Sequence, residues 1–340
     1  MTRLLAVDGN SLGHRAWHSS RDAIDEGDPR PLTTGAVVSM LATAWRYGPY
    51  DGVVVGFDHP VNRRKQDYPE YKSTRPPTPE PLRDALRRLR TDLDACGFAV
   101  MEHEGAEADD VLAAVVDACE HRAWTCDVLS SDRDLTALVS DTTRLLRPRA
   151  RFADLEVEDI PTVEQRYGIA PHHYTEFAAL RGDPSDGLAG ASGIGPKTAA
   201  RLLQDHGSIS GIYAALHDLP PKVETALRAG RDAVERNLLL MAPLPSVPVD
   251  VEQVPTVDPD RVEATLDPLE LSGAARRFRR SVLEPPPPMP EPPAEPPPDL
   301  DERHLQAEPF GEPSDDASRT AARARRPSCE ATEAVQDALF

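Results

Sequence analysis

Nine acidic side chains stand where predicted strands end or predicted helices begin, and their number suggests a site. A single acid in such a place is ordinarily a helix cap or a solvated loop residue. Acids that converge repel one another, and burying their charge is costly, so only cations make such a cluster tolerable. Ligands that are all oxygen suit Mg²⁺ or Mn²⁺ rather than zinc. The nine are Asp8, Asp58, Glu107, Asp109, Asp110, Asp132, Asp134, Asp183 and Asp186.

Hydrolysis of a phosphodiester is the chemistry that such a carboxylate cluster favours. Two divalent ions about 4 Å apart clamp a scissile phosphate, because one generates a nucleophilic water near neutral pH and the other stabilises the leaving oxygen. The ten histidines show no HExxH-type spacing. No Ser-His-Asp or Cys-His arrangement competes as a hydrolytic centre. The sequence therefore predicts an enzyme that uses two Mg²⁺ or Mn²⁺ ions.

The segment Glu107-Ala-Asp109-Asp110 poses a geometric question. Positions 107 and 110 share one face of a helix, whereas position 109 points elsewhere. We expect Glu107 to lie at or before the first turn, where the geometry is less constrained. The alternative is that these acids only favour a helix N-terminus electrostatically.

A glycine-containing turn at 193–198 reads Gly193-Ile-Gly195-Pro196-Lys197-Thr198. Proline fits the first turn of a helix, and glycines let a backbone approach a ligand closely. The free N–H groups of the helix start can then bind a phosphate of a DNA backbone, with Lys197 nearby. This predicts a helix-hairpin-helix element in which Gly193, Gly195, Lys197 and Thr198 contact DNA. A purely structural turn is the alternative.

Residues 59–80 form a polar, basic and proline-marked excursion that we do not expect in the core. Basic residues interleaved with aromatics are typical of surfaces that contact single strands through phosphates and stacked bases. Arg64 and Tyr71 are the candidates for DNA contact here, and Lys72 and Arg75 follow them. A solvated basic loop is the alternative.

The elements that must position these residues alternate between strands and helices, which predicts a parallel α/β sheet. Strands are predicted at 3–8, 52–58, 98–101, 125–130 and 143–146, and helices at 33–47, 81–95 and 107–118. Such sheets bind ligands at the carboxyl ends of their strands. We therefore predict an α/β core over 1–160, with 59–80 arching from it, and an all-helical DNA-binding region over 161–283.

The remaining residues, 284–340, are predicted to form a disordered tail. Ten of the sixteen residues from Glu284 to Asp299 are proline, and 281–340 hold thirteen acids against five bases. Such a composition favours an extended linker over a packed element. An inert tail and a tail that binds a polymerase or another replication or repair partner are both open.

The whole-chain numbers set weaker limits. The net charge of −19 argues against nucleic acid, but acids that bind metal would neutralise part of it. The four cysteines show no CxxC spacing, and no apolar stretch is long enough to span a membrane. The early acid at Asp8 leaves no room for a signal-peptide core. We expect a cytoplasmic protein with no membrane segment.

Taken together, these segments resemble the 5′-nuclease family, which includes the exonuclease domain of bacterial DNA polymerase I, phage 5′-nucleases and flap endonucleases. The resemblance runs in family order over about residues 3 to 280. The matching segments are Leu5-Ala-Val-Asp8-Gly-Asn10, Gly56-Phe-Asp58, Tyr71-Lys72-Ser-Thr-Arg75, Glu107-Ala-Asp109-Asp110-Val, Ser131-Asp132-Arg-Asp134-Leu, and Gly182-Asp183-Pro-Ser-Asp186 leading to Gly193-Ile-Gly195-Pro-Lys197-Thr-Ala.

The resemblance implies a PIN-like core, an arch and a helix-three-turn-helix module. One ion would be held by Asp8, Asp58, Glu107 and Asp109. The second ion would be held by Asp132, Asp134 and Asp186, with Asp110 and Asp183 in support. Lys72 and Arg75 would act on the scissile phosphate, and a monovalent ion such as K⁺ would bind the hairpin.

The implied activity is that of a monomeric 5′-3′ exonuclease and flap endonuclease on DNA with 5′ ends or flaps, in primer processing or repair. A structure-specific DNA-binding protein without catalysis is the runner-up, and an RNA-directed PIN-type nuclease is less favoured. The chain departs from the family pattern at Ser131, at Arg133 and at Gly187, which stands where the family usually has Asn. No polymerase domain follows, so we expect a free-standing relative.

Overall fold

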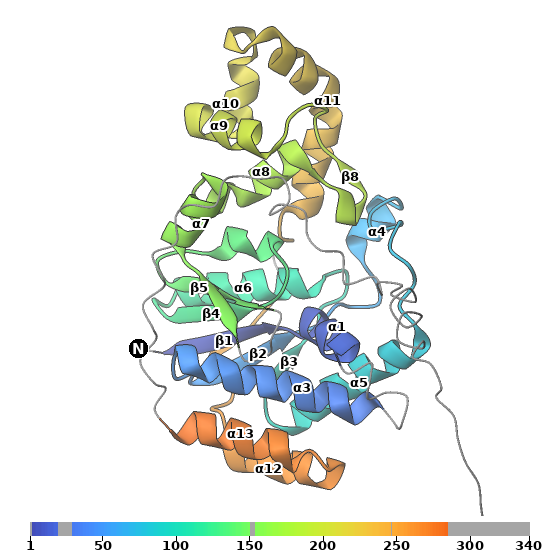
Figure 1. The fold of residues 1–340 in the computed structure, drawn as a ribbon, viewed down its shortest axis with the longest axis vertical. Coiled ribbons are helices and arrows are strands. Elements are labelled where there is room, and N and C mark those ends of the chain that lie inside the picture. The colour runs from blue at the N-terminus through green and yellow to red at the C-terminus, as the bar shows by residue number, and fades with distance from the viewer. Residues whose placement is uncertain (1, 20–28, 150–153, 246, 285–340) are drawn as a thin grey trace, which may run out of the picture. The chain divides into compact units, whose positions relative to one another are not determined.

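The computed structural model describes residues 2–19, 29–149, 154–245 and 247–284. A six-stranded sheet lies at the centre of the α/β part (Figure 1). The strand order is β3-β2-β1-β4-β5-β6; the first five are parallel and β6 pairs antiparallel with β5. The strands are β1 Arg3–Asp8, β2 Gly52–Gly56, β3 Ala99–Met101, β4 Thr125–Leu129, β5 Thr143–Pro148 and β6 Leu155–Glu158. The five strands predicted from sequence are confirmed; β6 was not predicted.

The register of the sheet brings several acids to one edge. Asp8 pairs with Gly56, and Val7 pairs with Leu129, so β1, β2 and β4 end level with one another. The acids that follow these strands in the sequence therefore start from the same edge, as expected for parallel strands.

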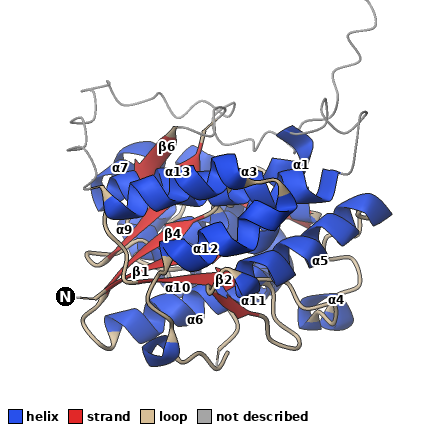
Figure 2. Ribbon diagram, turned by 90° about the horizontal axis from the view of Figure 1, so that it is seen from below, coloured by secondary structure: helices blue, strands red, loops and turns tan. Residues whose placement is uncertain are grey.

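Helices cover both faces of this sheet (Figure 2). Alternate residues of β1 face opposite cores: Leu4 and Ala6 pack in one apolar cluster, and Leu5 and Val7 in the other. The Leu5 face is covered by α1 (Gly9–Ser19), α3 (Pro29–Ala44), α5 (Glu80–Ala95), α12 (Pro259–Leu266) and α13 (Ser272–Leu283), and the Leu4 face by α6 (Ala108–Glu120).

A second group of helices follows β6. They are α7 Ile160–Tyr167, α8 Tyr174–Arg181, α9 Pro196–His206, α10 Ile209–Ala214 and α11 Pro221–Met241. A short ribbon, β7 Gly182–Asp183 with β8 Leu188–Ala189, leads into the predicted hairpin. No helix in the described ranges is long and apolar enough to cross a membrane.

The last two helices differ from the sequence expectation. Residues 161–283 were predicted as one helical DNA-binding region, but α12 and α13 pack on the α/β core. Phe278 of α13 is fully buried and meets Trp45 and Phe98 at ring-centroid distances of 5.1 and 5.7 Å. Their amphipathic pattern did not reveal which surface they cover, because their partners lie some two hundred residues earlier.

One smaller difference concerns a helix start. The helix predicted from Thr33 begins at Pro29, and Thr33 and Thr34 are buried within it rather than capping it. Thr34 donates its hydroxyl to the buried carboxylate of Asp92.

The arch, predicted to lie outside the core, contains the short helix α4 (Arg63–Asp67) and two buried side chains that are described below. The predicted tail, 284–340, lies outside the described residues apart from Glu284.

Candidate functional site

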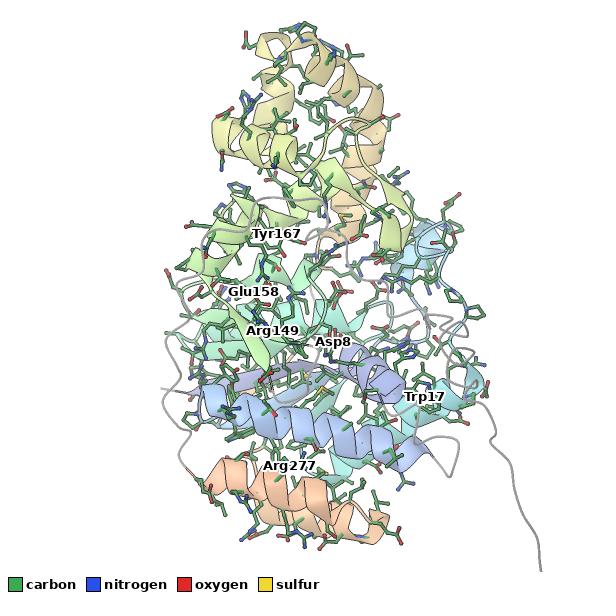
Figure 3. The ribbon with its side chains drawn as sticks, in the orientation of Figure 1. Asp8, Trp17, Arg149, Glu158, Tyr167 and Arg277 are labelled. Carbon is green, nitrogen blue, oxygen red and sulfur yellow. The ribbon has the colours of Figure 1, made fainter. Side chains whose placement is uncertain are left out.

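The end of β1 places Asp8 at the centre of the candidate site (Figure 3). Its side chain is almost fully buried, and it accepts hydrogen bonds from the amide of Ser11 (2.8 Å) and the hydroxyl of Ser130 (2.7 Å). Burial raises the pKa of Asp8 to about 7, and the charges of Asp58 and Asp132 add to the rise. Within the described residues no base pairs with this carboxylate, so hydrogen bonds hold it in position while its charge is not neutralised.

The start of α6 supplies the next acids. Glu107 is the N-cap of this helix, as expected from its spacing, and forms a capping box with Asp110. Asp58, after β2, accepts from the amide of Ala108 at 2.8 Å. Asp109 is half-buried, and burial together with Asp132 and Asp8 raises its pKa well above the usual range. The helix N-terminus thus brings acids from β2 and α6 toward Asp8.

The loop after β4 contributes Asp132 and Asp134. Asp132 accepts from the amide of Asp134 at 2.9 Å. The Oδ1 atom of Asp134 is buried and has no hydrogen-bond partner within the described part of the chain. Burial raises the pKa of Asp134 to about 8, with Asp132 and Asp183 contributing. An orphaned buried carboxylate oxygen is costly, and a bound cation would satisfy it.

Two bases of the arch lie against this acidic edge. Lys72 Nζ is 2.7 Å from Glu107 Oε1, and the Lys72 amide donates to the Asp186 carbonyl at 3.0 Å. Arg75 pairs with the carboxylate of Asp186. Burial would raise the pKa of Glu107, but Lys72 and Arg64 outweigh it and hold that pKa below its usual value.

The donor set fits divalent cations. Every candidate ligand is a carboxylate, and Asp8, Asp109 and Asp134 show raised pKa values that bound cations would reverse. Over the described ranges, no three acidic, histidine or cysteine side chains are already arranged to hold a metal ion. Lys72 and Arg75 instead neutralise Glu107 and Asp186.

Two predicted metal ligands prove to be structural. Asp110 is fully buried, and its two oxygens accept four hydrogen bonds, two from Arg64 and one each from the amides of Glu107 and Leu244. Asp183 is occupied by Arg133 at 2.8 Å and by Ser185. We therefore assign both carboxylates to the supporting role that the resemblance implies, and not to direct contact with an ion.

Two predicted DNA contacts are also corrected. Arg64 and Tyr71 are 6% and 5% exposed, so neither presents a surface on which a base stacks. Arg64 bonds Asp110 and main-chain carbonyls, and Tyr71 donates its hydroxyl to Glu107 at 3.0 Å. The sequence pattern placed both in a basic loop because their partners lie at least 36 residues away.

The hairpin before α9 has the predicted form. Gly193 has φ +86°, which favours glycine, and a side chain there or at Gly195 would meet no atom within 4 Å. Gly195 caps α9, and Pro196 opens it. Lys197 is exposed and Thr198 is half-buried at this helix start. The turn therefore presents open backbone at a helix N-terminus, the arrangement that binds phosphate.

The departures from the family pattern have local explanations. Gly187 has φ +73° and ψ 19°, a left-handed conformation in which asparagine and glycine are both favoured. The amide of Ser131 donates to Ser11 at 3.1 Å, a contact that glycine would make equally well. Arg133 keeps the charge of the usual lysine and pairs with Asp183. These substitutions leave the loops formed.

Arg147 is a residue that the sequence analysis missed. It lies on β5 and donates to the Ser131 carbonyl at 3.0 Å, in the loop that bears Asp132 and Asp134. It also pairs with the fully buried Glu158 of β6 at 3.0 Å. The one available signal was an arginine directly after the apolar pair Leu145-Leu146 in a buried strand.

The order of the mostly parallel sheet, with acids near the carboxyl ends of its strands, fits a PIN-like nuclease fold. Residues 3–168 match the model of the 5′-3′ exonuclease N-terminal resolvase-like domain, and residues 169–261 match the 5′-3′ exonuclease C-terminal SAM fold. The chain belongs to the 5′-3′ exonuclease family.

Curated relatives are much longer than this chain. DNA polymerase I of Mycobacterium bovis is 35% identical over 278 residues, covering 78% of this chain and 30% of that protein. The thermostable DNA polymerase I of Thermus thermophilus is 33% identical over 296 residues, covering 86% of this chain and 34% of that protein. The chain thus spans about a third of these relatives.

Solved structures share the fold. The phage T5 D15 protein, co-crystallised with metal ions, is 20% identical with a TM-score of 0.59, and the match covers 83% of this chain and 98% of that one. Human GEN1 in complex with Holliday junction DNA is 13% identical with a TM-score of 0.53, covering 82% of this chain and 71% of that one.

Proposed function

We propose that the protein is a 5′-3′ exonuclease and flap endonuclease that hydrolyses DNA with the help of two Mg²⁺ or Mn²⁺ ions. The observation that carries the proposal is a set of carboxylates with raised pKa values at one sheet edge, Asp8, Asp109 and Asp134, which form no ion pair within the described residues. The arch base Lys72 lies beside them. The T5 D15 protein of the same fold was crystallised with metal ions, and GEN1 with DNA.

Seven acids remain as candidate ligands after the corrections above. Divalent ions bound there would supply a nucleophilic water and stabilise charge on the leaving oxygen. We assign one ion to Asp8, Asp58, Glu107 and Asp109, and the other to Asp132, Asp134 and Asp186.

The chain's own groups prepare and position this edge. Ser11 and Ser130 orient Asp8, and the amide of Ala108 orients Asp58. Lys72 and Arg75 place positive charge beside these acids, where they stabilise the negative charge that develops on a scissile phosphate. The open amides at the start of α9, with Lys197 and Thr198, bind the DNA backbone away from the chemistry, and a K⁺ ion at the hairpin would assist them.

A flap duplex labelled at its 5′ end tests this function. We expect cleavage near the junction with Mg²⁺, none with EDTA, and none for Asp134→Ala under either condition. Retained flap binding without cleavage in Mg²⁺ or Mn²⁺ would favour a DNA-binding protein without catalysis. Comparing DNA and RNA flaps in the same assay tests the choice of substrate, and primer processing or repair is the role that a DNA flap activity would serve.

A further inference from the structure

Arg64 lies where three separate segments of the chain meet. It belongs to α4 in the arch, it pairs with Asp110 in the first turn of α6, and it bonds the end of α11. Its five hydrogen bonds reach Leu240 O (2.7 Å), Ala242 O (2.9 Å), Asp110 Oδ1 and Oδ2 (2.7 Å each) and Glu107 Oε2 (3.4 Å). An arginine has five N–H donors, so every one is used.

Asp110, the partner of Arg64, contacts two of the same three segments. It accepts from the amide of Leu244 at 2.8 Å, just after α11, and from the amide of Glu107 at 2.8 Å. One buried ion pair therefore fixes both the start of α6, which carries Glu107 and Asp109, and the exit of α11. Charge-assisted bidentate pairs of this kind impose geometry more than they add stability.

The other end of this connection is the hairpin. In α11, Gly230 lies against Ala191, two residues before Gly193, where an added Cβ would come within 2.7 Å of the Ala191 backbone. The buried side chain of Asn237 donates to the carbonyls of Ala179 and Ala189. Continuous helix from Gly230 to Leu240 spans about 15 Å. Helix α11 thus links the hairpin to the start of α6, which carries Glu107 and Asp109, and has fixed contacts at both of its ends. We call the sheet edge with these acids the catalytic edge.

We propose that Arg64 is a positioning residue that couples the hairpin to the catalytic edge through α11, and so determines which phosphodiester is cut. The proposal rests on the function proposed above. DNA held at the hairpin meets Glu107 and Asp109 at a distance set by this helix and its two end contacts. Loss of Arg64 frees one end, so the same DNA would reach the acids in several registers.

The first experiment maps cleavage positions on a labelled flap. We expect one dominant position for the wild type, and several neighbouring positions with turnover lowered by about 10²-fold for Arg64→Gln. Binding of the flap in EDTA should change by less than about threefold, because the hairpin is intact. Arg63→Gln is the matched control, because it removes the same charge one residue away from Arg64. The side chain of Arg63 is 70% exposed. This variant should cut at the wild-type position.

Two further variants keep the proposal testable if Arg64→Gln does not fold. Arg64→Lys retains the charge but not the bidentate geometry, and should restore turnover partly while the cleavage positions stay spread. Gly230→Ala pushes α11 from Ala191 and should also spread the positions, although Arg64 is untouched. A folded Arg64→Gln or Gly230→Ala that cuts only at the wild-type position would overturn the proposal.

A second readout does not depend on cleavage. We expect flap DNA in EDTA to slow hydrogen exchange at residues 107–111 in the wild type and in Arg63→Gln, but not in Arg64→Gln. Equal protection in all three would overturn the coupling even if the enzyme were active. A wild type that shows the protection but cuts nothing would instead remove the proposed function and leave the coupling standing.

Discussion

Lys72 adopts a backbone conformation that is unusual for its type. Its φ of 56° lies in the left-handed region, and its amide donates to Asp186 while its ammonium reaches Glu107. Such conformations cost of order 1–3 kcal/mol and persist where surrounding contacts enforce them. The contacts here come from α6 and from the loop after β7, so the arch lysine is held against the acids from both sides.

Replacing this lysine separates catalysis from binding. Lys72→Ala should lower the turnover number for a flap by about 10²–10³-fold, because the lost charge acts on the transition state. The dissociation constant for the same DNA in EDTA should change by less than about threefold, since the proposed DNA contacts lie at the hairpin. Single-turnover kinetics and filter binding measure the two, with Lys65→Ala, exposed on α4, as the control. Equal losses of turnover and affinity would contradict this assignment.

At the residue scale, the sequence predicted the positions of several acids but not the burial of Arg64. The places of five acids were predictable from the sequence, whereas their roles as metal ligands stay predictions. Asp8 ends β1, Asp58 and Asp132 follow β2 and β4 within three residues, and Asp109 and Asp134 lie at helix starts. The burial of Arg64 was not, because its partners are a carboxylate 46 residues away and carbonyls 176 and 178 residues away. A basic loop and a buried ion pair have the same local composition.

At the scale of elements, two glycine-to-alanine substitutions test whether the hairpin before α9 requires a glycine backbone conformation. Gly193→Ala should lower the free energy of unfolding by about 1–2 kcal/mol, because alanine disfavours φ +86°. It should also weaken flap binding in EDTA, since the turn that offers its amides to phosphate is distorted. Gly273→Ala in α13, which has no neighbour within 4 Å of an added Cβ, should instead stabilise by roughly 0.5–1 kcal/mol.

Urea unfolding and fluorescence anisotropy check this pair. Unchanged DNA affinity in Gly193→Ala, with the stability loss present, would show that the turn supports the fold without contacting DNA.

The buried parallel strands were easier to predict from the sequence than the antiparallel strand β6. The buried parallel strands are nearly continuous apolar runs, such as Gly52–Gly56, and such runs are distinctive. In strand β6 the two apolar residues, Leu155 and Val157, alternate with Glu156 and Glu158, and both acids pair with Arg166. Its charge is neutralised by tertiary contacts that a local pattern does not contain.

For the molecule as a whole, α13 completes the apolar core of the sheet. Phe278→Ala should lower the free energy of unfolding by about 3–5 kcal/mol, because it removes a fully buried ring between Trp45 and Phe98. Leu283→Ala, at a position that is 61% exposed, should stay within about 0.5 kcal/mol of wild type. Equilibrium denaturation of both variants tests this, and equal small losses would mean that α13 contributes little to the core.

The whole molecule should also show a linkage between pH, divalent cations and stability. The pKa values of Asp8 and Asp134 rise from an ordinary 3.8 to about 7 and about 8 on folding. Between pH 3.8 and about pH 8 the folded state binds more protons than the unfolded state, so the free energy of unfolding falls as pH rises. His14, whose pKa falls from 6.5 to about 4 through burial, opposes this only below pH 6.5.

We therefore expect the melting temperature in EDTA to fall between pH 6.5 and pH 8.5. Mg²⁺ should raise it, and more at the higher pH, because the ion binds the deprotonated carboxylates. Asp134→Asn should be more stable than wild type in EDTA at pH 8.5 and should gain less from Mg²⁺. Differential scanning calorimetry measures both, and a melting temperature that rises with pH in EDTA would contradict the assignment.

The bases paired with the acidic edge have a consequence for how the protein is assembled in the cell. Arg64, Lys72, Arg75 and Arg133 act as built-in counterions for Asp110, Glu107, Asp186 and Asp183. Since these pairs form within the chain, they reduce the repulsion among the acids during folding, with or without a bound divalent ion. On the proposed function, loading of divalent ions would then be a separate, reversible step, and folded molecules without ions would form an inactive pool whose size follows the concentration of the free cation.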